Sequence, residues 1–195
     1  MKSNPKTGLL FGSFNPIHLG HLMIASYLSE FTDLEQIWFI VSPHNPLKEK
    51  KSLLADHHRL RMVNLAIEDD LKFKASNIEF KLPQPSYTID TLTYLQEKYP
   101  LQQFIPIIGS DNLTSFKKWK NWETLLKIYQ IYVYPRPDTG DHLFHDHPSF
   151  TMIDAPLITL SSTFIRQGIK AGRNMRHFLP EPVWKYIQEM NFYQK

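Results

Sequence analysis

Short apolar stretches alternate along this chain with longer segments in which apolar residues recur every three or four positions. The short stretches are typical of buried strands, and the longer segments of helices with one buried face. This alternation predicts an α/β fold, a doubly wound sheet of parallel strands with helices on both faces. The predicted strands are Thr7–Phe11, Gln36–Val41, Phe73–Ser76, Phe104–Gly109, Ile131–Tyr134 and Thr151–Ile153.

The helical spacing predicts two helices at the C-terminal end with no strand between them. A length of 195 residues fits one domain. We therefore predict a single Rossmann-like domain over residues 1–195, with a small C-terminal helical segment, 160–195, that packs across the mouth of the cleft. The predicted helices are His18–Phe31, Asp56–Ile67, Thr88–Lys98, Leu113–Trp119, Thr124–Lys127, Ser162–Ala171 and Pro182–Met190.

Ligands of parallel sheets bind at the carboxyl ends of the strands. In this chain the segments that follow strands are Gly12–His21, Ser42–Lys51, Gly109–Asp111 and Arg136. We expect these four segments to converge on one cleft.

The first of these segments reads Gly12-Ser13-Phe14-Asn15-Pro16-Ile17-His18-Leu19-Gly20-His21. Residues three apart share a helix face, so His18 and His21 can reach the same ligand. That ligand would lie at the first helical turn, where free N–H groups favour an anion. Gly20 is a poor helix former, which indicates close approach of a ligand to the backbone. A pair of histidines alone is more often helix surface, but this context favours a nucleotide phosphate site.

A second anion site is predicted at the start of the helix Ser162–Ala171. The hydroxyls of Ser161, Ser162 and Thr163, the helix N–H groups and Arg166 all lie on or before its first turn. Taken alone, Ser-Ser-Thr before a helix is more often an ordinary N-cap.

Both segments resemble signatures of the nucleotidyltransferase superfamily, which is related in fold to class I aminoacyl-tRNA synthetases. Residues 12–21 look like its G-x-F-x-P-x-H-x-G-H motif, and residues 161–166 look like its S-S-T-x-I-R motif. Two matches at opposite ends of the chain, in the right order, make a chance resemblance improbable. The resemblance implies attack on the α-phosphate of a nucleoside triphosphate, with release of pyrophosphate.

The middle of the chain resembles one family within it, the nicotinate mononucleotide adenylyltransferases. The matching blocks are Pro85–Leu92, Ile107–Leu113 followed by Trp119 and Trp122, Arg136-Pro137, and Leu179–Ile187. The resemblance implies transfer of the adenylyl group of ATP, with Mg²⁺, to nicotinate mononucleotide. Another phosphorylated acceptor, such as nicotinamide mononucleotide or phosphopantetheine, is the alternative, and a non-catalytic nucleotide sensor is a more distant one.

The resemblance also implies roles for individual residues. The catalytic residues would be His18, His21, Lys48 and Arg166. Lys48 lies in a loop that departs from the family, because Leu47 stands where a histidine is expected, and the role of His44 stays open. The acceptor would be bound by Ser13, Lys48, Tyr87, Thr88 and Trp119. ATP would be bound by Gly12, Ser13, Phe14, His18, Gly20, His21, Gly109, Asp111, Arg136, Ser161, Ser162, Thr163 and Arg166.

Composition narrows the class of protein. Without cysteine there are no disulfides, thiolate metal sites or cysteine nucleophiles. The net charge is +3 and the pI about 8.9, but the lysines are scattered, which argues against a nucleic-acid partner. No apolar run is long enough for a membrane span, and residues 1–6 lack the apolar core of a signal peptide, so we expect a cytoplasmic enzyme. The sequence leaves open whether the chain forms a homo-oligomer.

Two further groups of residues are assigned no function. His142, His145 and His147 have metal-like spacing but fall in a loop rich in Pro, Gly and Asp, so no metal site is assigned. Arg59 and Arg61 are expected on the solvated face of the helix Asp56–Ile67.

Overall fold

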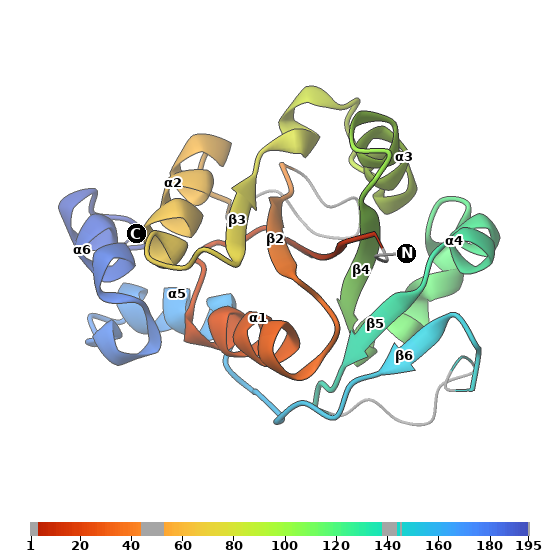
Figure 1. Cartoon of the computed structure of the whole chain (residues 1–195). Coiled ribbons are helices and arrows are strands. Elements are labelled where there is room, and N and C mark those ends of the chain that lie inside the picture. The colour runs from red at the N-terminus through yellow and green to blue at the C-terminus, as the bar shows by residue number, and fades with distance from the viewer. Residues whose placement is uncertain (1–3, 44–52, 138–143, 145, 195) are drawn as a thin grey trace.

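The computed structural model describes residues 4–43, 53–137, 144 and 146–194. Six strands form one sheet in the order β3-β2-β1-β4-β5-β6, and every neighbouring pair is parallel. The predicted doubly wound parallel sheet is therefore confirmed (Figure 1). The strands are β1 (Lys6–Gly12), β2 (Gln36–Val41), β3 (Phe73–Ser76), β4 (Gln103–Gly109), β5 (Ile131–Tyr134) and β6 (Phe150–Met152).

The helices also follow the predicted order, with one change of type. The segment predicted as a helix over 113–119 is a 3-10 helix, η3 (Ser110–Lys118). Its buried residues, Ser110, Leu113 and Phe116, are three positions apart, and a 3-10 helix places such residues on one face. The helices are α1 (Leu19–Phe31), α2 (Asp56–Ile67), α3 (Thr88–Lys98), α4 (Trp122–Ile128), α5 (Ser162–Lys170) and α6 (Glu181–Glu189), with short 3-10 helices η2 (Ile78–Lys81) and η4 (Arg176–Phe178).

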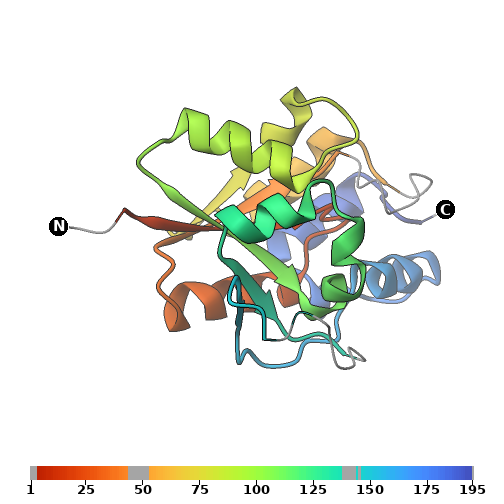
Figure 2. The ribbon, with the colours of Figure 1, turned by 90° about the vertical axis from the view of Figure 1, so that its right-hand side faces the viewer.

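The helices divide between two hydrophobic cores, one on each face of the sheet. The first core receives apolar residues of α1, α2, α5 and α6, and the second those of α3, η3 and α4. Figures 1 and 2 show these two layers of helices with the sheet between them. The two faces are thus covered by different parts of the chain, as a doubly wound sheet requires.

The order of the strands reverses between β1 and β4, which lie side by side at the centre of the sheet. In open α/β sheets this switch point is where ligands bind, beyond the carboxyl ends of the strands. Here β1 ends at Gly12 and β4 ends at Gly109. The fold therefore brings two of the predicted segments to the same edge.

The C-terminal segment packs against the first core rather than extending the sheet. In Figure 1, α5 lies beside α1, and α6 lies beside α2. The contact between α6 and α2 includes a bond of 2.8 Å between His58 Nδ1 and the Tyr186 hydroxyl.

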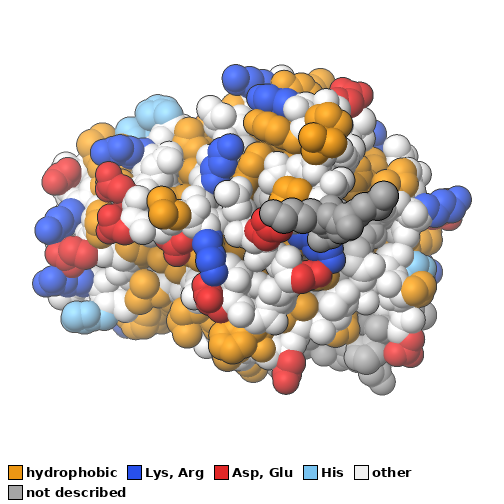
Figure 3. Space-filling model, viewed as in Figure 1, with side chains coloured by type: hydrophobic (Ala, Val, Ile, Leu, Met, Phe, Trp, Pro, Cys, Tyr) orange, Lys and Arg blue, Asp and Glu red, His pale blue; other side chains and the backbone are white. Residues whose placement is uncertain are grey.

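One face of the molecule is of mixed charge, and no described helix could cross a membrane. On the face shown in Figure 3, Lys and Arg side chains are interspersed with Asp and Glu. In the part of the chain that the structure describes, every helix is too short or too polar to cross a membrane.

Candidate active site

The loop after β1 is held by its own aromatic residue. Phe14 is 2% exposed and has a φ of 44°, in the left-handed region that costs a non-glycine residue free energy. Its ring lies over Gly12, where a Cβ would come within 2.8 Å of it, and meets the ring of His21 edge-on at 5.1 Å. The Phe14 side chain therefore belongs to the core.

His18 and His21 form a stacked pair at the start of α1. Their ring centroids are 3.7 Å apart, and His18 is the N-cap residue. The N–H of His18 donates to Nδ1 of His21 at 3.2 Å, and the N–H of His21 donates to the His18 carbonyl at 2.9 Å. The structure therefore brings the two rings together, as their spacing predicts.

Gly20 lies beneath this pair. A Cβ at Gly20 would stand 3.0 Å from Cγ2 of Ile158 and 3.1 Å from Nδ1 of His18. The sequence predicts that a ligand approaches this glycine closely, and the protein atoms nearest to it are those of Ile158 and His18. Gly20 allows the His18 ring and the segment after β6 to pack against the first turn of α1.

The two histidines differ in their surroundings. His18 is 4% exposed, and in the described part of the chain its Nδ1 is buried without a hydrogen-bond partner. Burial, and after it the charge of Arg136, lowers the pKa of His18 to about 3. At neutral pH His18 is thus an uncharged imidazole, so it can offer a hydrogen bond but not the positive charge that a protonated ring would supply.

Arg136 follows β5 and lies across the end of β4. Its N–H donates to Ser110 Oγ at 2.9 Å, and Nη1 donates to the Ile158 carbonyl at 3.3 Å. At Gly109 a Cβ would overlap Asp111 Oδ1 and come within 2.8 Å of Cγ of Arg136. Glycine is needed there because the arginine stem and the exposed Asp111 both pack over it.

Helix α5 brings the second motif onto the first. Ser162 Oγ donates to the Pro16 carbonyl at 2.9 Å, and Arg166 Nη1 donates to the Asn15 carbonyl at 2.9 Å. Arg166 also reaches Thr163 Oγ1 at 3.2 Å. Ser161 has the ordinary N-cap role, accepting from the N–H of Phe164 at 3.2 Å. The two motifs, far apart in sequence, therefore meet in one place.

The residues predicted to bind the acceptor lie at the start of α3 and the end of η3. Tyr87 is the N-cap residue of α3 and Thr88 is its first residue, and the Tyr87 side chain makes no capping bond. Lys120 joins the two elements: its Nζ lies 4.9 Å from the centre of the Tyr87 ring and 2.8 Å from Asp90 Oδ2. Trp119 directly follows η3, and its Nε1 is buried without a hydrogen-bond partner in the described residues.

Two buried ionisable residues near the strand ends were missed by the sequence reasoning. Arg59, predicted to be solvated, is 0% exposed, whereas Arg61 is exposed as expected. Glu79 is 2% exposed and accepts a bond of 2.8 Å from Thr91 Oγ1. Burial raises the pKa of Glu79, and the neighbouring hydroxyls of Ser42, Thr91 and Ser86 oppose that rise.

Spacing alone could have identified Arg59. It precedes Met62, Val63 and Ile67 by three, four and eight positions, so all four side chains share the buried face of α2. Glu79 carries no such signal in the sequence.

Several sequence predictions concern residues outside the described ranges. Lys48, His44 and Leu47 lie there, as do His142 and His145. His147 is described, and its ring packs edge-on against Phe144 and Phe150 at 6.4 and 6.0 Å.

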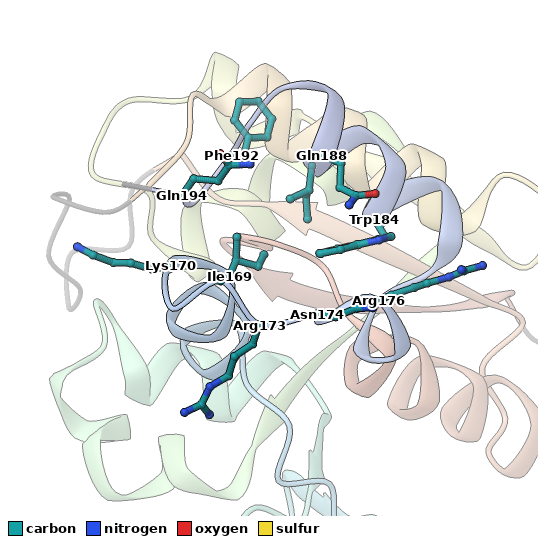
Figure 4. A pocket seen from close by; sticks show the side chains of 11 residues that line it. Ile169, Lys170, Arg173, Asn174, Arg176, Trp184, Gln188, Phe192 and Gln194 are labelled. Carbon is teal, nitrogen blue, oxygen red and sulfur yellow. The ribbon is translucent and has the colours of Figure 1, made fainter.

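A separate hollow of about 660 Å³ lies between α5 and α6, and none of the predicted site residues lines it. Ile169 and Trp184 face its interior, whereas Lys170, Arg173 and Arg176 point outward (Figure 4). Arg176 is engaged with Glu181 at 2.9 Å. The hollow is distinct from the edge of the sheet where the motifs meet.

The comparisons with known proteins place the chain in a family. Residues 9–168 match the model of the cytidylyltransferase-like family, a span that includes both motifs and all six strands except the first residues of β1. The fold and the site thus define a cytidylyltransferase-like protein.

Curated relatives narrow the class further. The chain is 55% identical over 192 residues to the probable nicotinate-nucleotide adenylyltransferase of Flavobacterium psychrophilum, covering 97% of this chain and 100% of that one. It is 45% identical to the protein of the same description from Bacteroides thetaiotaomicron, over 94% of this chain and 91% of that one. The chain therefore belongs to the nicotinate-nucleotide adenylyltransferase family.

A solved structure shares the fold at low sequence identity. The nicotinic acid mononucleotide adenylyltransferase of Plasmodium falciparum, complexed with NaAD, superposes with a TM-score of 0.80 at 20% identity, over 97% of both chains. This similarity independently supports the architecture of the whole chain.

Proposed function

We propose that this chain transfers the adenylyl group of ATP to nicotinate mononucleotide, giving deamido-NAD and pyrophosphate. The observation that carries the proposal is the meeting of Ser162 and Arg166 with the loop after β1, beside His18 and His21. A second group of residues, at the start of α3, would bind the planar acceptor. The near full-length similarity to adenylyltransferases of this acceptor supports the choice of reaction.

The reaction needs no general base. A phosphate oxygen of nicotinate mononucleotide, already an anion, forms a bond to the α-phosphorus of ATP. The bond from that phosphorus to the bridging oxygen breaks, and pyrophosphate leaves with the electron pair. Catalysis of such a step depends on alignment and on stabilisation of the negative charge that spreads over the phosphate oxygens.

Arginine side chains supply positive charge near the phosphates in this proposal. Arg166 extends from α5 to the loop after β1, and Arg136 lies close enough to His18 to lower its pKa. Lys48 would add a third charge. His18 acts as a neutral hydrogen-bonding group, and His21, stacked on it, contacts the α-phosphate region. Residues 160–195 close the phosphate site within a single domain over 1–195.

Backbone and hydroxyl groups complete the phosphate site. The predicted contributors are Gly12, Ser13, Phe14 and Gly20 from the first motif, and Ser161, Ser162 and Thr163 at the start of α5. The first turns of α1 and α5 would present their N–H groups to the triphosphate. The substrate is MgATP, whose metal ion neutralises charge on the leaving pyrophosphate. Asp111, an exposed carboxylate beside Gly109, is suited to a ribose hydroxyl or to a metal-bound water.

The acceptor would bind between η3 and α3. The indole of Trp119 offers a face on which a pyridine ring can stack. The N–H groups at the start of α3, with the Thr88 hydroxyl, would bind the pyridine carboxylate. Among the described residues the buried Nε1 of Trp119 has no acceptor, which supports a polar ligand at this place, since buried N–H groups in proteins are rarely left without one.

The test is pyrophosphate release from MgATP, with nicotinate mononucleotide and nicotinamide mononucleotide as parallel acceptors. We expect release to be at least about tenfold faster with the acid, because the helix N-terminus and Thr88 favour a carboxylate over an amide. Equal or faster release with the amide would contradict the carboxylate pocket. Release with neither would contradict the acceptor, and phosphopantetheine would be tried next.

A further inference from the structure

The guanidinium of Arg59 forms hydrogen bonds with three segments: Ser13 after β1, Ser42 and Pro43 after β2, and residues 54–56 at the start of its own helix. The side chain is 0% exposed. Its Nη1 donates to the carbonyls of Ser13 at 2.6 Å and Ser42 at 2.8 Å, and its Nε donates to the carbonyl of Leu54 at 3.0 Å. Its Nη2 pairs with Asp56 at 2.6 Å, a carboxylate whose side chain is 41% exposed, and donates to the carbonyl of Pro43 at 3.5 Å. A buried charge persists only where its donors are well satisfied, and here backbone carbonyls supply most of the acceptors.

The two carbonyls bound by Nη1 belong to the loops that follow β1 and β2. The strands are paired as far as Gly12 and Val41, and the N–H of Ser42 still donates to the Gly12 carbonyl at 2.9 Å. Beyond this point the chains part. A single guanidinium nitrogen of Arg59 donates to both Ser13 and Ser42. Arg59 therefore joins the two chain segments just beyond the last hydrogen bond between β1 and β2.

The bond to Ser13 also sets the direction of the next N–H. In a trans peptide the carbonyl and the N–H point to opposite sides, so fixing the Ser13 carbonyl fixes the Phe14 N–H. Phe14 has the positive φ of 44° described above. A backbone held in such a conformation persists only where its surroundings determine it strongly.

We infer that Arg59 is a positioning residue for the nucleotide, holding the loops after β1 and β2 in the arrangement that receives the triphosphate. It acts through Ser13 and Ser42 and touches no reacting atom. The inference rests on the proposed function for the identity of the nucleotide. Lysine cannot replace it, because an ammonium group has its donors at one point, whereas the guanidinium fork reaches several acceptors at once.

The experiment compares Arg59→Lys with Arg61→Lys, an exposed arginine two positions along the same helix. The dissociation constant of MgATP is measured by titration calorimetry at 10 °C, without an acceptor. We expect binding to weaken by at least about tenfold in R59K, as for loss of charge-assisted hydrogen bonds, and to stay unchanged in R61K. Wild-type affinity in a folded R59K would overturn the inference.

A purely structural arginine would behave differently. Its replacement would lower the melting temperature but leave the affinity for MgATP unchanged at 10 °C, where the variant is folded. The variant Asp56→Asn provides the complementary measurement, since it removes the carboxylate partner and keeps the four carbonyl bonds. We expect D56N to melt at a lower temperature and to bind MgATP as the wild type does. Weakening equal to that of R59K would contradict the inference.

If R59K does not fold, the inference is tested by amide hydrogen exchange of the wild-type protein with and without MgATP. MgATP must then slow the exchange of amides in residues 12–15 and at Ser42 together, because one side chain joins the two loops. Slowing in only one of them would overturn the inference. The binding measurements need no acceptor, so a protein that binds MgATP but releases no pyrophosphate with nicotinate mononucleotide would refute the proposed reaction and leave the role of Arg59 intact.

Discussion

At the scale of single residues, His18 and His21 show how position changes the chemistry of one side chain. His18 is the N-cap residue of α1 and is almost wholly buried, whereas His21, one turn later, is half-buried and stacks on it. The burial of His18, together with the charge of Arg136, keeps it uncharged at neutral pH. We therefore expect the two residues to respond differently to mutation and to pH.

Replacing His21 by Ala is expected to lower kcat on the order of 100-fold, because one hydrogen-bond donor to the α-phosphate region is lost. Turnover is measured by pyrophosphate release, together with the melting temperature, since His21 also accepts a bond from the His18 N–H. His57→Ala, at an exposed position on α2, is the control. Near-wild-type turnover in H21A would refute a catalytic role for His21.

The buried His18 should also make the free energy of unfolding depend on pH. Its pKa is about 3 in the folded protein and near 6.5 when unfolded, so below pH 6.5 the unfolded chain takes up a proton that the folded chain does not. Stability is then full above pH 6.5 and falls as pH decreases toward 3, by about 1.4 kcal/mol per unit at most.

Urea unfolding at pH 7 and pH 5 measures this effect. Between these values the wild type should lose about 1–2 kcal/mol more than His18→Gln, which has no titrating group there. The pKa of His58 is also lowered, mainly by burial, so H58Q serves as a comparison. Identical pH dependence in wild type and H18Q would contradict the neutral, buried imidazole.

At the scale of elements, the sequence predicted strands better than it predicted helix type. All six strands are parallel, and the four inside the sheet, β1, β2, β4 and β5, are mostly buried, so their apolar runs are easy to recognise. The bounds of β2, β3 and β5 are the predicted ones. The segment before Trp119 became a 3-10 helix because Ser110, Leu113 and Phe116 are buried at a spacing of three. Such a short run does not distinguish the two helix types.

The site was predicted less completely than the fold. The structure brings His18 and His21 together, but it also buries Arg59 and Glu79, which are ionisable residues that composition rules assign to the surface. Their positions depend on loops that meet only in the folded chain: Arg59 bonds to residue 13, a separation of 46 positions. The spacing of residues along a helix shows which side chains share a face, but it does not show which distant segment packs against that face.

The end of η3 gives a prediction about the acceptor. Trp119→Ala should raise KM for nicotinate mononucleotide by about tenfold, the loss of ring stacking and some apolar burial, and leave KM for ATP nearly unchanged. Trp119→Phe should restore most of the affinity, because it keeps an aromatic face. Trp122→Ala is the control, since that ring packs against Phe144. A change in both KM values would indicate a general structural defect instead.

At the scale of the whole molecule, the last residues of the described chain complete the structure around the first motif. The hydroxyl of Tyr193 donates to Oδ1 of Asn15 at 2.9 Å, and the same oxygen accepts from the N–H of Leu54 at 3.2 Å. The carbonyl of Asn15 is bound by Arg166. Asn15 is therefore held by three distant parts of the chain at once.

Tyr193→Phe should lower the free energy of unfolding by about 1 kcal/mol, the usual loss for one hydrogen bond, and raise KM for ATP by roughly fivefold as the loop loosens. Tyr27→Phe is the matched control, because its hydroxyl donates to the Asp154 carbonyl at 2.6 Å outside the motifs. Chemical unfolding and steady-state kinetics measure both variants. Loss of stability without a kinetic change in Y193F would show that Tyr193 does not act on the loop.

Because Tyr193 follows all six strands along the chain, its hydrogen bond to Asn15 can form only late in synthesis. A ribosome makes these two residues 178 positions apart, and the sixth strand is complete by Met152. A nascent chain that ends after β6 contains all six strands. It still lacks α5, α6 and Tyr193, of which α5 and Tyr193 bind the loop after β1. A chain terminated at that point would lack the apolar residues that α5 and α6 add to the first core, as well as the bonds that hold Asn15.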